Sequence, residues 1–200
     1  DIRTDGAITL YGKTYSIATG STALTIVTSS DAVQFLKATG ETGNVTLADN
    51  KLTIDTDTTG TTGGNITFEG DIIGSNTGGS NVPVDLVLDA VTKTLTVLNI
   101  GHTSSTDGTE INDVTLTGAT VSTNGKINTT ANSTDKGTVT ITGALSLTGN
   151  TTIETDTAAS TGGSHTDGDI TIDGTIDGEK TLTLTSGSGA IDISNLIGNT

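Results

Sequence analysis

The segment Ile170-Thr171-Ile172-Asp173-Gly174-Thr175-Ile176-Asp177-Gly178 decides the fold, because apolar and polar residues alternate in it and a glycine follows each short run. Alternation with period two predicts β-strands whose aliphatic side chains share one face and whose polar side chains share the other. Asp-Gly pairs favour turns, since Gly accepts a positive φ. The segment therefore predicts very short strands separated by tight corners.

The same pattern runs through the rest of the chain as triplets with two outer apolar residues and, usually, a central Thr. Thr favours strands and tolerates solvent, so each triplet is predicted to present two side chains inward and one outward. The triplets are Ile8–Leu10, Val45–Leu47, Leu52–Ile54, Ile66–Phe68, Leu86–Leu88, Leu95–Val97, Val114–Leu116, Val139–Ile141, Leu145–Leu147, Ile170–Ile172, Leu182–Leu184 and Ile191–Ile193. Asp31–Lys37 is the only segment in which the sequence suggests a helical turn.

Strands with two inward residues cannot be stable alone, so the core must come from stacking many of them. Stacking of this kind is the principle of a solenoid, and we predict an all-β parallel β-helix (β-solenoid) with about 20 residues per coil. Asp-Gly and Asn-Gly pairs also serve as hairpin turns, which leaves a tandem of immunoglobulin-like β-sandwiches as the alternative.

The composition favours a narrow core over a wide one. The chain has 27 Gly, one Pro, no Cys, no Trp and four aromatic residues, and its hydrophobic residues make up 31%. Aromatic side chains bury the largest areas, and a core only a few aliphatic side chains across does not need them. The alternation and the near absence of Pro argue against disorder.

The net charge of −15 excludes some functions and favours a location. Such a charge repels phosphate backbones and anionic membranes, so we expect neither nucleic-acid binding nor membrane insertion. Zero Cys is compatible with a secreted, extracellular or cell-surface protein that is stabilised without disulfides. The chain begins at Asp1 instead of Met, and we expect it to be a mature fragment or an excerpt of a longer protein.

A long internal repeat of about a hundred residues is also visible, with copies at about 43–142 and from 143 to 200 onward. We interpret residues 1–200 as one continuous solenoid segment. The matching pairs of segments are Thr42–Asn50 with Thr142–Asn150, Ile54–Thr58 with Ile153–Thr157, and Ile66–Gly70 with Ile170–Gly174.

The run from Gly168 to Ile191, and the shorter run Gly64–Ile72, resemble repeats of filamentous-haemagglutinin-like giant bacterial surface proteins. The resemblance implies an exported right-handed parallel β-helix with a role in adhesion, biofilm or surface-fibre formation. It implies as partners copies of the chain itself or neighbouring segments of a fibre, and glycans or a surface. The secretion domain of that family is not visible in these residues.

Calcium is the cofactor that the sequence favours if there is one. Asp107, Asp167 and Asp169 lie among Gly, Ser and Asn, whose carbonyl groups add oxygen ligands. No EF-hand loop or Gly-rich calcium nonapeptide accompanies them, and ordinary solvated carboxylates are the alternative interpretation. His102 and His165 are expected to be exposed loop residues, because a zinc site gathers three or four N or S ligands.

The sequence argues against an enzyme, and no catalytic residue is assigned. The densest acidic cluster is Asp167, Asp169, Asp173 and Asp177, but few basic and aromatic residues accompany it for a polysaccharide cleft. Pairs such as Thr183-Leu184-Thr185 suggest an ice-binding array, yet their spacing along the sequence is irregular.

The expected function is a structural or adhesive segment of a bacterial surface fibre, sheath or adhesin stalk. Tandem adhesin domains are the alternative, and ice binding and polysaccharide cleavage are more distant ones.

Overall fold

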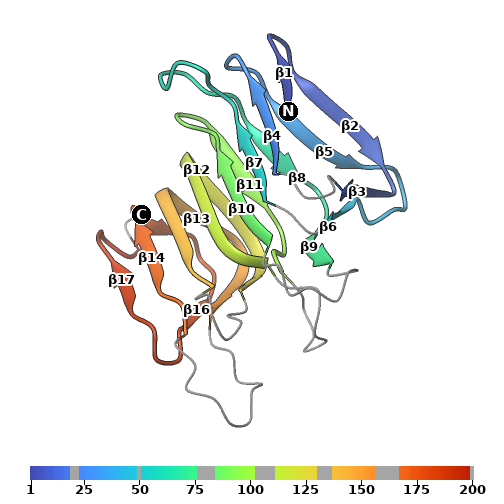
Figure 1. The fold of residues 1–200 in the computed structure, drawn as a ribbon. Helices are drawn as coiled ribbons and strands as arrows, with labels where there is room; N and C mark the ends of the chain where they lie inside the picture. Colours follow the sequence, from blue (N-terminus) through green and yellow to red (C-terminus); the bar gives the residue numbers. More distant parts are fainter. Residues whose placement is uncertain are drawn as a thin grey trace.

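The chain folds into a parallel β-solenoid whose coils are about 28 residues apart (Figure 1). The computed structural model describes residues 1–18, 23–48, 51–75, 84–101, 111–129, 137–155 and 167–198. Within these ranges the chain consists of strands and corners, and no helix is present. The first coils and the last coils lie at opposite ends of the stack.

The coils contribute strands to up to three faces, which we call the first, second and third face in chain order. The first face contains β1 (Ile2–Thr4), β4 (Leu24–Thr28), β7 (Leu52–Asp55), β10 (Val84–Asp89), the first parts of β12 (Ile111–Asn128) and β13 (Val139–Glu154), β14 (Ile170–Asp173) and β17 (Ile191–Ile193). The second face contains β2 (Ile8–Gly12), β5 (Val33–Lys37), β8 (Ile66–Phe68), β11 (Thr94–Val97), the middles of β12 and β13, and β15 (Ile176–Asp177). The third face contains β3 (Thr14–Ala18), β6 (Asn44–Ala48), β9 (Ile72–Ser75), the ends of β12 and β13, and β16 (Leu182–Thr185).

Every strand pair is parallel, and this confirms the predicted solenoid and excludes the antiparallel sandwiches. The predicted 20 residues per coil is wrong, because the corners are longer than the strand triplets suggested. Coils range from 21 residues between Ile172 and Ile193 to 34 between Ile54 and Leu88. The right hand of the winding stays a prediction.

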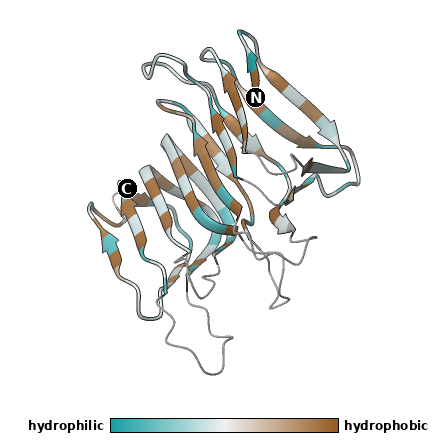
Figure 2. Cartoon of the chain, in the orientation of Figure 1, coloured by the Kyte–Doolittle hydropathy of each residue, from teal (hydrophilic) through white to brown (hydrophobic). Residues whose placement is uncertain are grey.

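The core is a narrow column of aliphatic rows enclosed by the three faces. One row on the first face passes through Ile54, Leu88, Leu116 and Ile141, all of which are fully buried. Figure 2 shows the alternation of hydrophobic and hydrophilic residues along the strands. All twelve predicted triplets lie within strands, which confirms the predicted strands. In the end coils Leu10 and Ile191 are exposed, so not every triplet buries both of its outer residues.

Aromatic side chains fill the core in the first coils. The rings of Phe35 and Phe68 stack with centroids 4.7 Å apart, and Tyr15 meets Phe35 edge-on at 5.3 Å. Phe35 belongs to the segment in which the sequence suggested a helical turn, and that suggestion is wrong. Val33 and Phe35 instead alternate with outward neighbours in β5, which pairs with β2 and β8.

Glycines let successive corners stack closely between the first and second faces. Gly143 has a φ of +111°, and a Cβ built on it would lie 1.7 Å from the carbonyl oxygen of Gly118. One coil further, a Cβ on Gly174 would lie 2.0 Å from the carbonyl oxygen of Gly143. The predicted glycine corners are therefore sites of close backbone approach as well as turns.

Buried hydroxyl groups close other corners by donating to the backbone of a later segment. Thr129 donates to the carbonyl of Gly137 at 2.6 Å, and Thr155 donates to that of Gly168 at 2.6 Å. Thr56 donates to the carbonyl of Gly64 at 3.0 Å and accepts from its N–H at 2.9 Å. These bonds satisfy polar groups that the coil stack removes from water.

The internal sequence repeat does not span a whole number of coils. Each matched segment in the second copy lies on the face that precedes the face of its counterpart. Val45 in β6 is on the third face, whereas its match Leu145 in β13 is on the second. The triplet of β8 is on the second face, whereas its match in β14 is on the first.

Candidate functional site

The residues predicted as calcium ligands do not form a shared site in the described residues. Asp107 lies outside them. Asp167 accepts hydrogen bonds from the N–H and hydroxyl of Ser188 at 2.7 and 2.8 Å. Asp169 accepts from the N–H of Ala190 at 2.8 Å. Both carboxylates therefore connect two successive coils through hydrogen bonds.

The wider acidic cluster is also distributed over the corners. Asp173 accepts a long 3.5 Å hydrogen bond from the Asn195 amide, and Asp177 accepts from the N–H of Gly178 at 3.1 Å. No group of three or more His, Cys, Asp or Glu side chains placed to hold a metal occurs in the part of the chain that the structure describes. His102 and His165 lie outside that part.

Threonines line up on the outer side of the first face, which their irregular sequence spacing did not predict. Thr25 pairs with Thr53, and Thr115, Thr140 and Thr171 follow one another in successive coils. Coil lengths differ, so residues at unequal sequence intervals reach the same position. The row is interrupted where Val87 separates Thr53 from Thr115, and it ends at Asp192.

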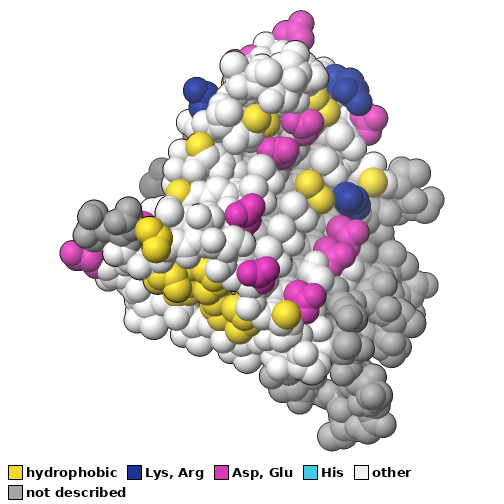
Figure 3. Space-filling view, turned by 90° about the vertical axis from the view of Figure 1, so that its left-hand side faces the viewer, with side chains coloured by type: hydrophobic (Ala, Val, Ile, Leu, Met, Phe, Trp, Pro, Cys, Tyr) yellow, Lys and Arg dark blue, Asp and Glu magenta, His cyan; other side chains and the backbone are white. Residues whose placement is uncertain are grey.

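Carboxylates occupy the neighbouring outward row of the first face. Asp55 pairs with Asp89, and Asp173 occupies the same row beside Thr142. Figure 3 shows acidic side chains distributed along one side of the molecule, with few basic ones near them. The outer side of the first face therefore carries hydroxyl groups and negative charge, in agreement with the net charge of −15.

Asp57 is a nearly buried carboxylate in the corner between the first and second faces. It accepts the Thr59 hydroxyl at 2.7 Å, the N–H of Thr59 at 2.6 Å and the N–H of Thr62 at 2.7 Å. The N–H of Thr61 also donates to it. The Thr59 hydroxyl and these N–H groups hold the pKa of Asp57 well below its usual range. Asp57 thus stabilises the loop of residues 57–62 through these hydrogen bonds.

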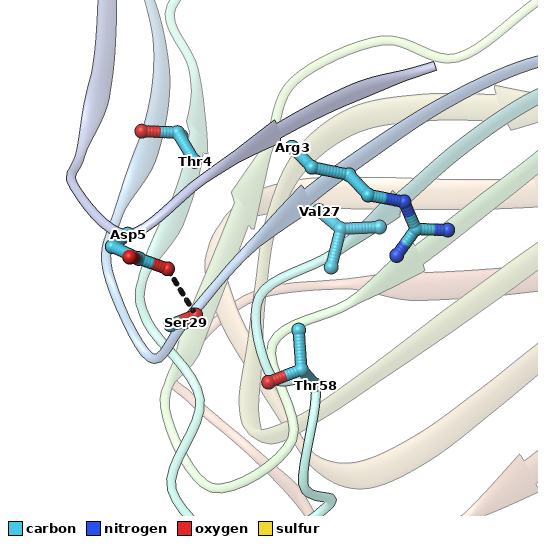
Figure 4. Close-up of a pocket in the computed structure, with 6 residues that line it drawn as sticks. All are labelled: Arg3, Thr4, Asp5, Val27, Ser29 and Thr58. Carbon is cyan, nitrogen blue, oxygen red and sulfur yellow. Dashed lines mark hydrogen bonds between the residues drawn. The ribbon is translucent and has the colours of Figure 1, made fainter.

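A shallow depression of about 380 Å³ lies at the N-terminal end of the first face (Figure 4). Its lining includes Arg3, the only Arg of the chain, and the carboxylate of Asp5, which accepts the Ser29 hydroxyl at 3.1 Å. The Arg3 guanidinium and the Asp5 carboxylate point in different directions in Figure 4. The depression is lined by one basic and one acidic side chain, and its polar groups do not surround an enclosed space.

The two ends of the coil stack expose strand edges together with apolar side chains. At the N-terminal end, Ile2, Leu10 and Tyr11 are exposed, Tyr11 by 73%. In the last coil, Leu196 and Ile197 are 68% and 65% exposed. Figure 3 shows hydrophobic side chains gathered on the side where the last coils lie. Among the described residues, the large hydrophobic side chains that are exposed all lie at these two ends.

A β-bulge on the first face was missed by the sequence analysis. Between Val84–Ile111 and Leu86–Val114 the register shifts, so Asn112 and Asp113 of β12 both oppose Asp85 of β10. The Asp85 carboxylate accepts from the Asn112 amide nitrogen at 3.1 Å and from the Asp113 N–H at 3.4 Å. The available signal was the pair of polar residues in Ile111-Asn112-Asp113-Val114, which breaks the alternation.

Comparison with known proteins identifies no relative, since no family model, curated protein or solved structure matches the chain. The described residues contain no helix with the length and hydrophobicity needed to cross a membrane.

Proposed function

We propose that the chain is a structural and adhesive segment of a secreted bacterial surface fibre, sheath or adhesin stalk. The observation that carries the proposal is the continuous stacking of parallel strands along one axis on the first and second faces. Each coil bonds to the next through backbone ladders and buries its aliphatic rows against its neighbours. Stiffness along the axis follows from this arrangement and needs no catalytic residue.

Self-association is the second part of the proposal. A free strand edge presents unpaired N–H and C=O groups that accept a further strand, and apolar side chains beside it favour that contact. Such an edge takes either a neighbouring segment of the same fibre or another copy of the chain. The acidic outer faces oppose lateral aggregation through charge repulsion, which directs association to the ends.

The proposal is tested by sedimentation velocity and negative-stain electron microscopy over a range of protein concentrations. Elongated assemblies of uniform width that lengthen with concentration are expected. Leu196→Glu places a carboxylate on the exposed apolar edge and should leave single solenoids. Ser146→Glu is the matched control, since it adds the same charge to the outward row of the second face in a middle coil.

Two results would refute self-association: single particles at every concentration, or assembly of Leu196→Glu that equals assembly of the unchanged chain. Circular dichroism of both variants shows whether the fold is retained.

We also propose that the fibre lies at the cell surface or outside the cell, and that glycans or a solid surface are its ligands. We expect no enzymatic activity.

The aligned threonines of the first face support ice binding as a second candidate function. Coils about 4.8 Å apart set a regular spacing along the row of hydroxyl groups. Thermal hysteresis of the freezing point tests this candidate, with Thr140→Lys in the row and Thr183→Lys on the third face as its control. Absence of hysteresis in the unchanged chain eliminates it.

A further inference from the structure

We propose that copies of the chain join head to tail, with the last coil of one copy stacked on the first coil of the next. The inference rests on the self-association proposed above and adds its direction and its register. On the first face, β17 of one copy pairs in parallel with β1 of another copy. On the second face, the segment around Ile197, which bridges to β15, lies against β2.

The first observation is that the inward rows of side chains begin and end at matching positions. On the first face, the row that begins at Ile2 continues through every coil to Ile193. On the second face, the row that begins at Ile8 continues to Ile197. A second copy stacked at the spacing of one coil, about 4.8 Å, sets Ile193 against Ile2. The same step sets Ile197 against Ile8, so both rows continue in register.

The second observation is that both ends expose the groups that this contact covers. Ile2 is 47% exposed and Ile197 is 65% exposed, whereas Leu116 and Val121, which lie in the same two rows in a middle coil, are fully buried. Within the described residues, β1 pairs only with β4, and β17 pairs only with β14. A further coil therefore buries these side chains and completes these backbone ladders as each internal coil does.

The distribution of charge gives the contact its direction. Residues 1–18 contain two acidic and two basic residues, whereas residues 167–198 contain six acidic residues and one Lys. Two C-terminal ends therefore repel each other. A C-terminal end that meets an N-terminal end finds no net charge and is not repelled.

A symmetric contact between two like ends does not continue the rows. The two ends lie on opposite sides of the stack (Figure 1). A twofold axis across two N-terminal ends pairs β1 with β1 in antiparallel orientation, whereas the strand pairs within the chain are parallel. Such a contact closes as a dimer, but a head-to-tail contact leaves one free end of each kind and builds a fibre. The third face ends one coil earlier, at β16, so the contact is confined to the first and second faces.

Mixing two variants that are each blocked at one end tests the direction. Ile2→Glu blocks the N-terminal edge and Ile197→Glu blocks the C-terminal edge, and each variant alone is expected to stay single in sedimentation velocity. Their equimolar mixture is expected to form particles of twice the mass and nothing longer, because one free end of each kind remains. Ser146→Glu, which adds the same charge to a middle coil, is the matched control and should assemble like the unchanged chain.

The outcomes separate this inference from the proposed function. Dimers of either blocked variant alone, with no new species in the mixture, would show contacts between like ends. That result would overturn the head-to-tail arrangement and leave self-association intact. Single particles of the unchanged chain at every concentration would refute self-association itself, and the head-to-tail arrangement with it.

A disulfide tests the register and keeps the test valid if circular dichroism shows that a Glu variant has lost its fold. The chain has no Cys, so Arg3→Cys and Ser194→Cys each introduce a single thiol on the outer side of an end strand. In the proposed register these two residues lie opposite each other at about 4.8 Å, within the Cα separation of about 4.4–6.8 Å that disulfides span.

Mild oxidation of the mixture of Arg3→Cys and Ser194→Cys is expected to link the two variants rapidly. Arg3→Cys mixed with Ser122→Cys, whose thiol lies on a middle coil, is the control and should link much more slowly. Equal rates of linkage in the two mixtures would overturn the register. Faster linkage of Arg3→Cys with itself than with Ser194→Cys would overturn the direction.

Discussion

Gly143 lies so close to the corner of the preceding coil that a Cβ on it would be 1.7 Å from the carbonyl oxygen of Gly118. Gly143 also has a positive φ of +111°, which side chains rarely adopt. Two independent effects therefore disfavour any other residue at this corner. One is the conformation of the backbone, and the other is the contact with the preceding coil.

Gly143→Ala should lower the free energy of unfolding by about 2–4 kcal/mol, since the positive φ and the forced separation of two coils both cost energy. Urea unfolding measures the loss. Gly40→Ala is the control, because Gly40 has a φ of +81° with no atom within 4 Å of its ideal Cβ. This control should lose about 1–2 kcal/mol. Equal losses at both positions would show that coil contact contributes nothing.

Phe35→Ala should destabilise the first coils by about 3–5 kcal/mol, because it removes a buried ring that contacts both Phe68 and Tyr15. Tyr11→Ala, at a side chain that is 73% exposed, should change stability by less than about 0.5 kcal/mol. Thermal unfolding followed by circular dichroism provides the comparison. A similar melting temperature for both variants would contradict the aromatic contribution to the core.

Asp57→Asn should destabilise the chain near neutral pH. The pKa of Asp57 is lowered in the folded state, so its contribution is present above the unfolded pKa of about 3.9 and is lost as the pH falls below it. The difference between Asp57→Asn and the unchanged chain should therefore shrink below about pH 4. Denaturant unfolding at several pH values tests this, and a difference that is constant between pH 3 and pH 7 would contradict it.

Val91→Asn should stabilise the chain by about 1 kcal/mol. Val91 is β-branched and has a φ of +53°, a region that Asn tolerates much better. The replacement relieves strain in the corner that follows β10. The melting temperature should rise, whereas Val87→Asn, at an outward position in a strand, should not raise it. A lower melting temperature for Val91→Asn would show that its side-chain packing outweighs the strain.

The strands and the core could be predicted from the sequence because each triplet carries its own evidence. In Val139-Thr140-Ile141, the alternation of apolar and polar residues is enough to predict which side chains face inward. No information about the neighbouring strands is needed. The coil length could not be predicted in the same way. It depends on corners such as the one around Asp57, whose hydrogen bonds join residues that carry no hydrophobic pattern.

The candidate site was less predictable, because it depends on which coils become neighbours. Asp85 and Asn112 are brought together by the pairing of β10 with β12 and by a register shift. Thr25 and Thr53 share a row because β4 pairs with β7. The sequence around Asp31–Lys37 was misinterpreted because Phe35 is apolar at a spacing that suits either a helix or a strand, and only its partners Leu10 and Phe68 decide between them.

The mismatch between the internal repeat and the coil has a consequence for how the molecule presents itself. Because Val45 on the third face corresponds to Leu145 on the second, one further copy of the repeat would bring the same motif to the first face. The two copies in this chain thus present the outward residues of the same motif, Thr46 and Ser146, toward two different sides of the rod.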